Sequence, residues 1–191
     1  MSKLMEKADV TIIGGGIMGL STAYHLAKSG SNVILVEMGK IAAGASGCNN
    51  GEFSRGYGES GELGIYAGSY KMYEDWSKSG ELGYDIEFEV DSEIWLLTDE
   101  HIESMKHGPW KRRLEIWEKA GRRPLKRDEW KISEPNISED IKWGIETTVN
   151  TINIWKVCHG LAQTAKKYGA KIFTHTKVND IEVKKDKVEN V

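Results

Sequence analysis

The N-terminal part of the chain predicts an α/β fold, in which helices cover a parallel sheet. A short apolar strand at residues 10–13 runs into a glycine-rich turn at 14–19, and a second apolar strand follows at 33–36. Between them, apolar residues recur every three or four positions as far as Gly30, which indicates a helix that ends at a left-handed glycine. This order is typical of a βαβ unit with parallel strands. Because both strands are apolar on each face, we expect helices to cover them from both sides.

Composition places the chain among ordinary folded proteins and excludes several classes. Its 191 residues are 39% hydrophobic and 29% charged, which suits one large domain or two small ones. The 26 basic and 29 acidic residues leave a net charge of −3 without a long run of one sign, so no nucleic-acid partner is expected. No apolar run approaches the roughly 18 residues of a transmembrane helix. Cys48 and Cys158 have neither disulfide-scaffold nor zinc-site spacing, which predicts no metal and a reducing, cytoplasmic setting.

The glycines of the first turn have a chemical reason for their spacing. Gly14 permits the tight turn out of the strand, Gly16 lets the backbone approach a pyrophosphate, and Gly19 lets the helix lie close to the sheet. The amides that begin the helix, including those of Ile17 and Met18, would then receive the phosphates, because a helix N-terminus carries partial positive charge. These five residues are therefore predicted to bind the pyrophosphate of a dinucleotide.

An acidic residue stands where an adenosine would be bound. Glu37 follows the second strand, 18 residues beyond Gly19, where a carboxylate accepts hydrogen bonds from the two ribose hydroxyls. A 2′-phosphate would be repelled there. Met38, the next residue, is included in the predicted site. Strand, glycine motif, helix, strand and terminal acid in this order predict a Rossmann-like adenine dinucleotide site, which fits NAD or FAD.

A loop of small residues at 43–51 favours FAD over NAD. Its lack of bulk would let Ala45, Ser46, Asn50 and Gly51 reach a second stretch of pyrophosphate and the flavin, although such a loop taken alone is more often a flexible turn. Cys48 lies in the same loop. Its thiolate would be favoured by nearby amides and could react with or sense the cofactor, whereas the simpler interpretation is a small residue that fills space.

The combined pattern resembles a known family. The strings GGGIMGLSTAYHLAKSG, VILVE and GASGCNNG are similar to the opening of the FAD-dependent D-amino-acid oxidase family, which includes glycine oxidase and sarcosine oxidase. The resemblance implies a Rossmann-like FAD-binding domain with part of a second, mixed-sheet substrate domain. It also implies hydride transfer to FAD from the carbon that bears the amine of a small-molecule amine or amino acid. No catalytic residue is assigned, because hydride transfer to a flavin can proceed without a dedicated acid or base and the residues that hold the substrate are expected beyond Val191.

The rest of the chain fits this family at lower specificity. Expected strands lie at 85–90, 93–98, 141–147, 151–154, 171–175 and 178–183. Expected helices lie at 62–77, 111–120, 125–130 (ended by Pro135) and 155–168, with one more capped by Asp99. GAKIFTHTKVNDIE resembles the segment in which the chain re-enters the FAD domain, which implies that the backbone of Val178 meets the adenine. Where relatives often have Asp-Pro, this chain has Asn153-Ile154.

Predicted domains follow from that order. Residues 1–84 form the first part of the FAD-binding domain, 85–154 part of the substrate domain, and 155–191 the return into the FAD-binding domain. The resemblance covers about the N-terminal half of the family fold, so the chain is a truncated product, a fragment, or one half of a split protein completed by a second chain. The alternative to an enzyme is a non-catalytic FAD-binding module or one subunit of a split enzyme.

Overall fold

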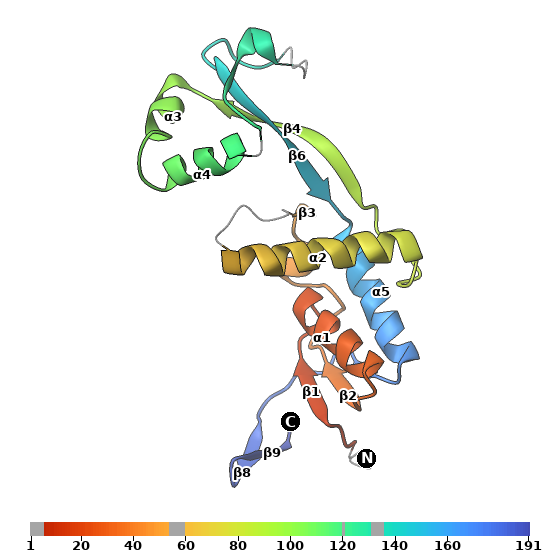
Figure 1. The fold of residues 1–191 in the computed structure, drawn as a ribbon. Coiled ribbons are helices and arrows are strands. Elements are labelled where there is room, and N and C mark those ends of the chain that lie inside the picture. The colour runs from red at the N-terminus through yellow and green to blue at the C-terminus, as the bar shows by residue number, and fades with distance from the viewer. Residues whose placement is uncertain (1–5, 54–59, 120, 131–135) are drawn as a thin grey trace. The chain divides into compact units, whose positions relative to one another are not determined.

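The computed structural model describes residues 6–53, 60–119, 121–130 and 136–191 (Figure 1). It forms two compact units. Unit 1 contains Met1–Gly51, Tyr73–Phe88 and Ile152–Val191, and unit 2 contains Glu52–Met72 and Glu89–Thr151. The division therefore differs from the predicted 1–84, 85–154 and 155–191, mainly because residues 52–72 belong to unit 2. The physical reason is that β3 (Glu52–Phe53) pairs antiparallel with β6 (Trp143–Thr151).

Unit 1 contains the predicted βαβ arrangement. Its parallel sheet has the order β1 (Val10–Ile13), β2 (Val33–Val36), β7 (Lys171–Phe173), and α1 (Ile17–Lys28) connects the first two strands. The central strand β2 is buried as expected. The expectation that β1 is covered on both faces is wrong, because Thr11 and Ile13, which share one face of the strand, are exposed and the side chain of Ile13 is 54% exposed.

Helix α5 (Ile154–Lys167) packs against α1 and completes the core of unit 1 (Figure 1). Its buried side carries Val157, Leu161 and Ala165 at helical spacing. Asn153 caps it, since its side chain accepts a hydrogen bond from the Lys156 amide at 3.1 Å. The Asn-Ile pair thus starts the helix without a proline. The side-chain Nδ2 group of Asn153 also donates to the carboxylate of Glu87 at 2.9 Å, which an aspartate could not do.

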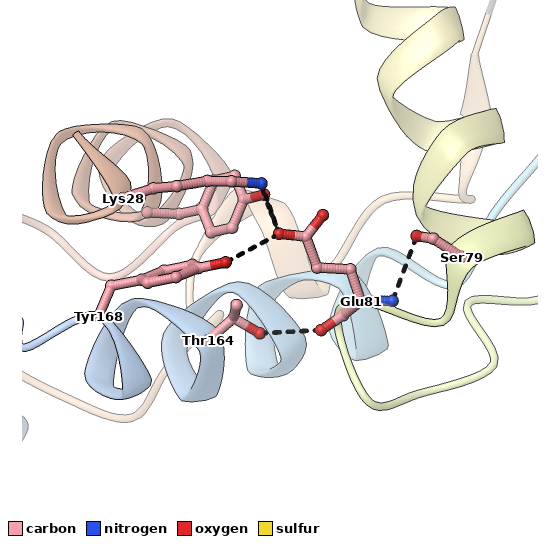
Figure 2. Close-up of polar contacts among 6 residues, drawn as sticks. Lys28, Ser79, Glu81, Thr164 and Tyr168 are labelled. Atoms are coloured by element: carbon pink, nitrogen blue, oxygen red, sulfur yellow. Dashed lines mark hydrogen bonds and ion pairs between the residues drawn. The ribbon is translucent and has the colours of Figure 1, made fainter.

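A polar cluster joins the carboxyl ends of α1 and α5 to the segment after α2 (Ser60–Ser79). Figure 2 shows that Lys28 and Tyr168 point toward one carboxylate oxygen of Glu81. That oxygen, Oε1, accepts from Lys28 Nζ at 2.6 Å, from the Tyr24 hydroxyl at 2.6 Å and from the Tyr168 hydroxyl at 3.3 Å. The Thr164 hydroxyl donates to the Glu81 carbonyl at 3.4 Å. Three segments far apart in sequence therefore meet at one side chain.

Unit 2 is built on the antiparallel pair β4 (Glu89–Leu97) and β6, with β5 (Leu125–Lys126) beside β6. Helices α3 (Asp99–Ser104) and α4 (Gly108–Lys119) pack on one face of the pair. The core of this unit consists of Leu97, Met105, Trp117 and Ile145. A long, twisted two-stranded ribbon with helices beside it is visible in Figure 1.

Several predicted boundaries in unit 2 need correction. The strands expected at 85–90 and 93–98 are one strand that begins at Glu89, because Ile86 is fully buried in unit 1 and Glu87 has a φ of +55°. Strand β6 covers most of the strand expected at 141–147 and ends at Thr151. The strand expected at 151–154 is not formed, because Asn153 caps α5 and Ile154 begins that helix. Thr98, and not Asp99, is the N-cap of α3.

The remaining differences are local. The helix expected at 125–130 is strand β5 followed by the 3₁₀ turn η2 (Arg127–Glu129), and Pro135 lies outside the described residues. Strand β7 is shorter than the expected 171–175. The strand expected at 178–183 is reduced to β8 (Glu182–Lys184), which pairs with β9 (Lys187–Asn190) in a hairpin. Among the described residues, no helix is long and apolar enough to cross a membrane.

Candidate functional site

The glycine turn between β1 and α1 has the close packing that its spacing predicted. Gly14 has a φ of +111°, a conformation that favours glycine, and its amide donates to the Val36 carbonyl at 2.8 Å. A Cβ atom placed on Gly19 would lie 2.1 Å from the Gly14 carbonyl oxygen and 3.3 Å from Ile12 Cγ2. No side chain fits at Gly19 without moving backbone. The helix can therefore start directly at the carboxyl end of the strand.

Ser46 lies at the N-terminus of α1. Its hydroxyl oxygen accepts a hydrogen bond from the Ile17 amide at 3.0 Å, and a Cβ on Gly16 would lie 3.0 Å from the same oxygen. The helix has no acidic residue of its own in the first turn, which favours an anion at its N-terminus. Ser46 was predicted to reach a second stretch of pyrophosphate and the flavin, and the structure places its hydroxyl beside the amides that begin α1. Met18 is 80% exposed, so its side chain makes no core contact.

The Glu37 side chain is hydrogen-bonded to the backbone of the glycine turn. Its carboxylate accepts from the Gly15 amide and from the Gly39 amide, each at 2.6 Å. A carboxylate has about four acceptor positions, so two amides leave room for two further donors such as ribose hydroxyls. Sequence reasoning pointed to the hydroxyls and missed the amides, because neither glycine has a side chain that signals the contact. Met38 is 72% exposed beside it.

Hydrogen bonds of Asn49, a residue that the sequence did not single out, connect two parts of the small-residue loop. Ala45–Gly47 form a 3₁₀ turn, η1, and a Cβ on Gly47 would lie 2.0 Å from the Ala42 carbonyl oxygen. The Asn49 side chain donates to the Ser46 carbonyl at 2.5 Å and accepts from the Gly51 amide at 2.6 Å. Asn49 therefore shapes the loop.

The other predicted loop residues have simpler surroundings. Ala45, Cys48 and Asn50 are exposed, and the thiol of Cys48 is free. Gly51 has a φ of +77°, and a Cβ there would lie 2.3 Å from the Ile152 carbonyl oxygen. Glycine is thus required at 51 both by conformation and by space.

The segment that leads to Val178 runs beside Glu37. The Thr176 amide donates to the Glu37 carbonyl at 2.9 Å, and the Glu37 amide donates to the Phe173 carbonyl at 2.8 Å. The His175 amide donates to the Gly39 carbonyl at 3.0 Å. Val178 lies two residues after Thr176 and is half-buried. The carboxyl ends of β2 and β7 thus bring together two segments that were predicted to surround an adenosine.

These groups suit a bound FAD. A helix N-terminus without an acidic residue in its first turn and the Ser46 hydroxyl match a diphosphate, and the Glu37 carboxylate matches a ribose diol. The absence of side chains at Gly47 and Gly51 lets the loop pack closely on the Ala42 and Ile152 carbonyls beside these groups. Fold and site together define an α/β protein that binds an adenine dinucleotide.

Comparison with known proteins narrows this class. Residues 9–191 match the family model described as "DAO: FAD dependent oxidoreductase", so the chain belongs to this family of FAD-dependent oxidoreductases. Its cofactor is FAD. The resemblance deduced from the glycine turn and the small-residue loop is confirmed, as is the α/β fold.

Relatives of known structure or sequence cover the chain to different extents. Glycine oxidase from Bacillus cereus ATCC 14579 aligns with a TM-score of 0.78 and 25% identity over 95% of this chain and 51% of its own. Gamma-glutamylputrescine oxidoreductase of Escherichia coli (strain K12) is 42% identical over 64 residues, which are 34% of this chain and 15% of that protein. Anaerobic glycerol-3-phosphate dehydrogenase subunit A1 of Haloferax volcanii is 27% identical over 98% of this chain and 31% of that protein. The chain thus spans about half the length of the solved relative, and less of the curated ones.

Proposed function

We propose that this chain is the FAD-binding part of an oxidoreductase that acts on a small amine or amino acid. The observation that supports FAD binding is the meeting of Ser46, Glu37 and the N-terminus of α1 at the carboxyl ends of the strands. Support for an amine substrate comes from relatives whose names state such substrates, namely glycine oxidase and gamma-glutamylputrescine oxidoreductase. When bound, the flavin supplies the acceptor for a hydride from the carbon that bears the amine.

The proposed roles of individual residues follow from their positions. Amides at Gly16 and Met18 and the hydroxyl proton of Ser46 would hold the pyrophosphate, and Ile17 would take part through the hydrogen bond that its amide donates to Ser46. Glu37 would accept the ribose hydroxyls while it keeps the Gly15 and Gly39 amides in place. Gly14 and Gly19 provide the turn and the close packing of the helix.

The loop and the returning segment would hold the other parts of FAD. Ala45, Asn50 and Gly51 are proposed on the flavin side, and Val178 beside the adenine. Support for the last assignment is the pair of backbone hydrogen bonds that tie residues 173–176 to Glu37. No residue of this chain is assigned to acid or base catalysis.

Absorption spectroscopy tests the proposal directly. The purified chain, mixed with FAD and desalted, should show flavin bands. Once the C-terminal half of the fold is supplied, anaerobic addition of glycine, sarcosine, L-proline or putrescine should bleach them. Bands that no amine bleaches would favour a non-catalytic FAD-binding module. A chain that cannot be reconstituted with FAD would overturn the proposal.

A second substrate class has specific support. Anaerobic glycerol-3-phosphate dehydrogenase subunit A1 aligns with 98% of this chain, so glycerol 3-phosphate belongs in the same bleaching assay. Bleaching by glycerol 3-phosphate and by none of the amines would replace the amine proposal with this one.

Activity is proposed for this chain together with the rest of the family fold. Because the solved relative is about twice as long as the matched region, the remaining half would come from the same polypeptide or from a complementary chain. Adding the C-terminal half of the fold as a separate polypeptide should then increase the rate of bleaching.

A further inference from the structure

The side chain of Asn49 connects three parts of the small-residue loop. Its Oδ1 atom accepts the Gly51 amide at 2.6 Å, and its Nδ2 group donates to the Ser46 carbonyl at 2.5 Å. The first of these bonds is an Asx turn, in which an asparagine holds the backbone two residues ahead. The second reaches three residues back. One carboxamide therefore spans the stretch from Ser46 to Gly51.

Ser46 in turn connects Asn49 to the N-terminus of α1. While its carbonyl is held by Asn49, the hydroxyl of Ser46 accepts the Ile17 amide at 3.0 Å. The Gly16 N-cap has no side chain to do this, so Ser46 serves as the capping group from a distant part of the chain. The Asn49 carboxamide is thus linked through one residue to the proposed pyrophosphate position.

Neighbouring geometry leaves the loop little freedom elsewhere. Gly47 and Gly51 pass so close to the Ala42 and Ile152 carbonyls that a Cβ would lie 2.0 Å and 2.3 Å from their oxygens. The two ends of the turn are fixed by this packing, and the residues between them are exposed. In the exposed middle, the 3₁₀ turn is held by the hydrogen bonds from the Gly47 and Cys48 amides to the Gly44 and Ala45 carbonyls, and the Asn49 side chain connects this turn to Gly51.

We propose that Asn49 is the positioning residue of the cofactor loop: it holds the Ser46 hydroxyl and the Gly51 backbone in the arrangement that receives FAD. It acts through Ser46 and Gly51 and need not touch the cofactor. This inference rests on the proposed function only in that the loop binds FAD. The sequence pattern gave a cofactor contact to the neighbouring Asn50 and no role to Asn49.

FAD affinity of the full chain is the test, measured by quenching of flavin fluorescence at equilibrium. Asn49→Ala removes both hydrogen bonds and should weaken FAD binding about tenfold, the usual consequence of losing such contacts. Asn49→Ser can still accept the Gly51 amide, although more weakly, and should restore part of the affinity. Asn136→Ala, the same change at an exposed asparagine of unit 2, should leave the affinity unchanged.

Two measurements separate positioning from general destabilisation. The melting temperature of the FAD-free Asn49→Ala chain should stay close to that of the wild type, because both bonds are exposed. In a Ser46→Ala background, Asn49→Ala should cost at least threefold less affinity than in the wild type, since much of its effect passes through Ser46.

Different results would count against different claims. A wild-type chain that binds FAD while Asn49→Ala binds it equally well overturns the role of Asn49 and leaves the proposed function intact. Equal losses in the wild-type and Ser46→Ala backgrounds overturn the link through Ser46. A wild-type chain that binds no FAD overturns the proposed function itself.

Discussion

Gly19 shows how one hydrogen atom in place of a methyl group permits the βαβ turn. Alanine at this position would place its Cβ 2.1 Å from the Gly14 carbonyl oxygen, so the start of α1 would have to move away from the strand. We expect Gly19→Ala to lower the free energy of unfolding by about 1–3 kcal/mol and to abolish FAD binding. Urea denaturation and fluorescence titration measure the two effects.

The matched control is Gly68→Ala. Gly68 also lies inside a helix, but a Cβ there would meet nothing within 4 Å. The substitution should raise the free energy of unfolding by about 0.5–1 kcal/mol, because alanine favours helix over glycine. Equal effects of the two substitutions would contradict a steric role for Gly19.

Glu37 combines a structural and a binding role at one carboxylate. Glu37→Ala should weaken FAD binding by roughly 1.5–3 kcal/mol, the value of hydrogen bonds to a charged group. Glu37→Gln should also weaken it, because its amide NH₂ would face a backbone N–H that also donates. Isothermal titration calorimetry gives the affinities, with Glu118→Ala on the exposed side of α4 as the control. An FAD affinity that survives Glu37→Ala would remove this residue from the site.

At the scale of the elements, Glu81 joins α1 to α5. The hydrogen bond from Lys28, followed by that from Tyr24, holds the pKa of the Glu81 carboxyl below its ordinary value. The same carboxylate raises the pKa of Lys28. For a carboxyl whose pKa is lowered by folding, the stabilisation is present at neutral pH and is lost as the pH falls through the folded-state pKa. For Lys28 it is lost only at strongly alkaline pH.

Glu81→Gln should therefore destabilise the chain at pH 7 and have little effect at pH 3. The loss at pH 7 should be about 0.5–1 kcal/mol, a small value because the Lys28 side chain is 45% exposed and solvent screens the pair. Urea denaturation at both pH values measures it, with Glu115→Gln on α4 as a control. A difference of the same size at pH 3 would show that hydrogen bonding, and not charge, carries the effect.

At the scale of the whole molecule, FAD binding should stabilise unit 1 more than unit 2. The groups proposed to bind the diphosphate and the adenosine all lie in unit 1. At an FAD concentration 100 times the dissociation constant, the linked stabilisation is about 2.7 kcal/mol. We expect amide hydrogen exchange to slow at residues 14–19, 37–39 and 46–51, and to change less in β4 and β6.

Riboflavin is the control for that experiment, because it lacks both the diphosphate and the adenosine. At the same concentration it should give little protection in these three segments. Equal protection by riboflavin would mean that the diphosphate and ribose contacts proposed for Ser46 and Glu37 contribute little.

Local sequence determined the βαβ unit, the turn glycines and FAD as the cofactor. Strand and helix periodicity, and the small size of glycine, act within a few residues and can be read in order. Contacts between distant segments were decided only by the tertiary structure. The Ser46 hydroxyl reaches an amide 29 positions away, Glu37 binds two backbone amides, and Glu81 gathers α1 and α5. Strand β4 begins at Glu89 and not at 85 because Ile86 is buried in unit 1. Local patterns do not encode such partners, since they depend on which surfaces the folded chain brings together.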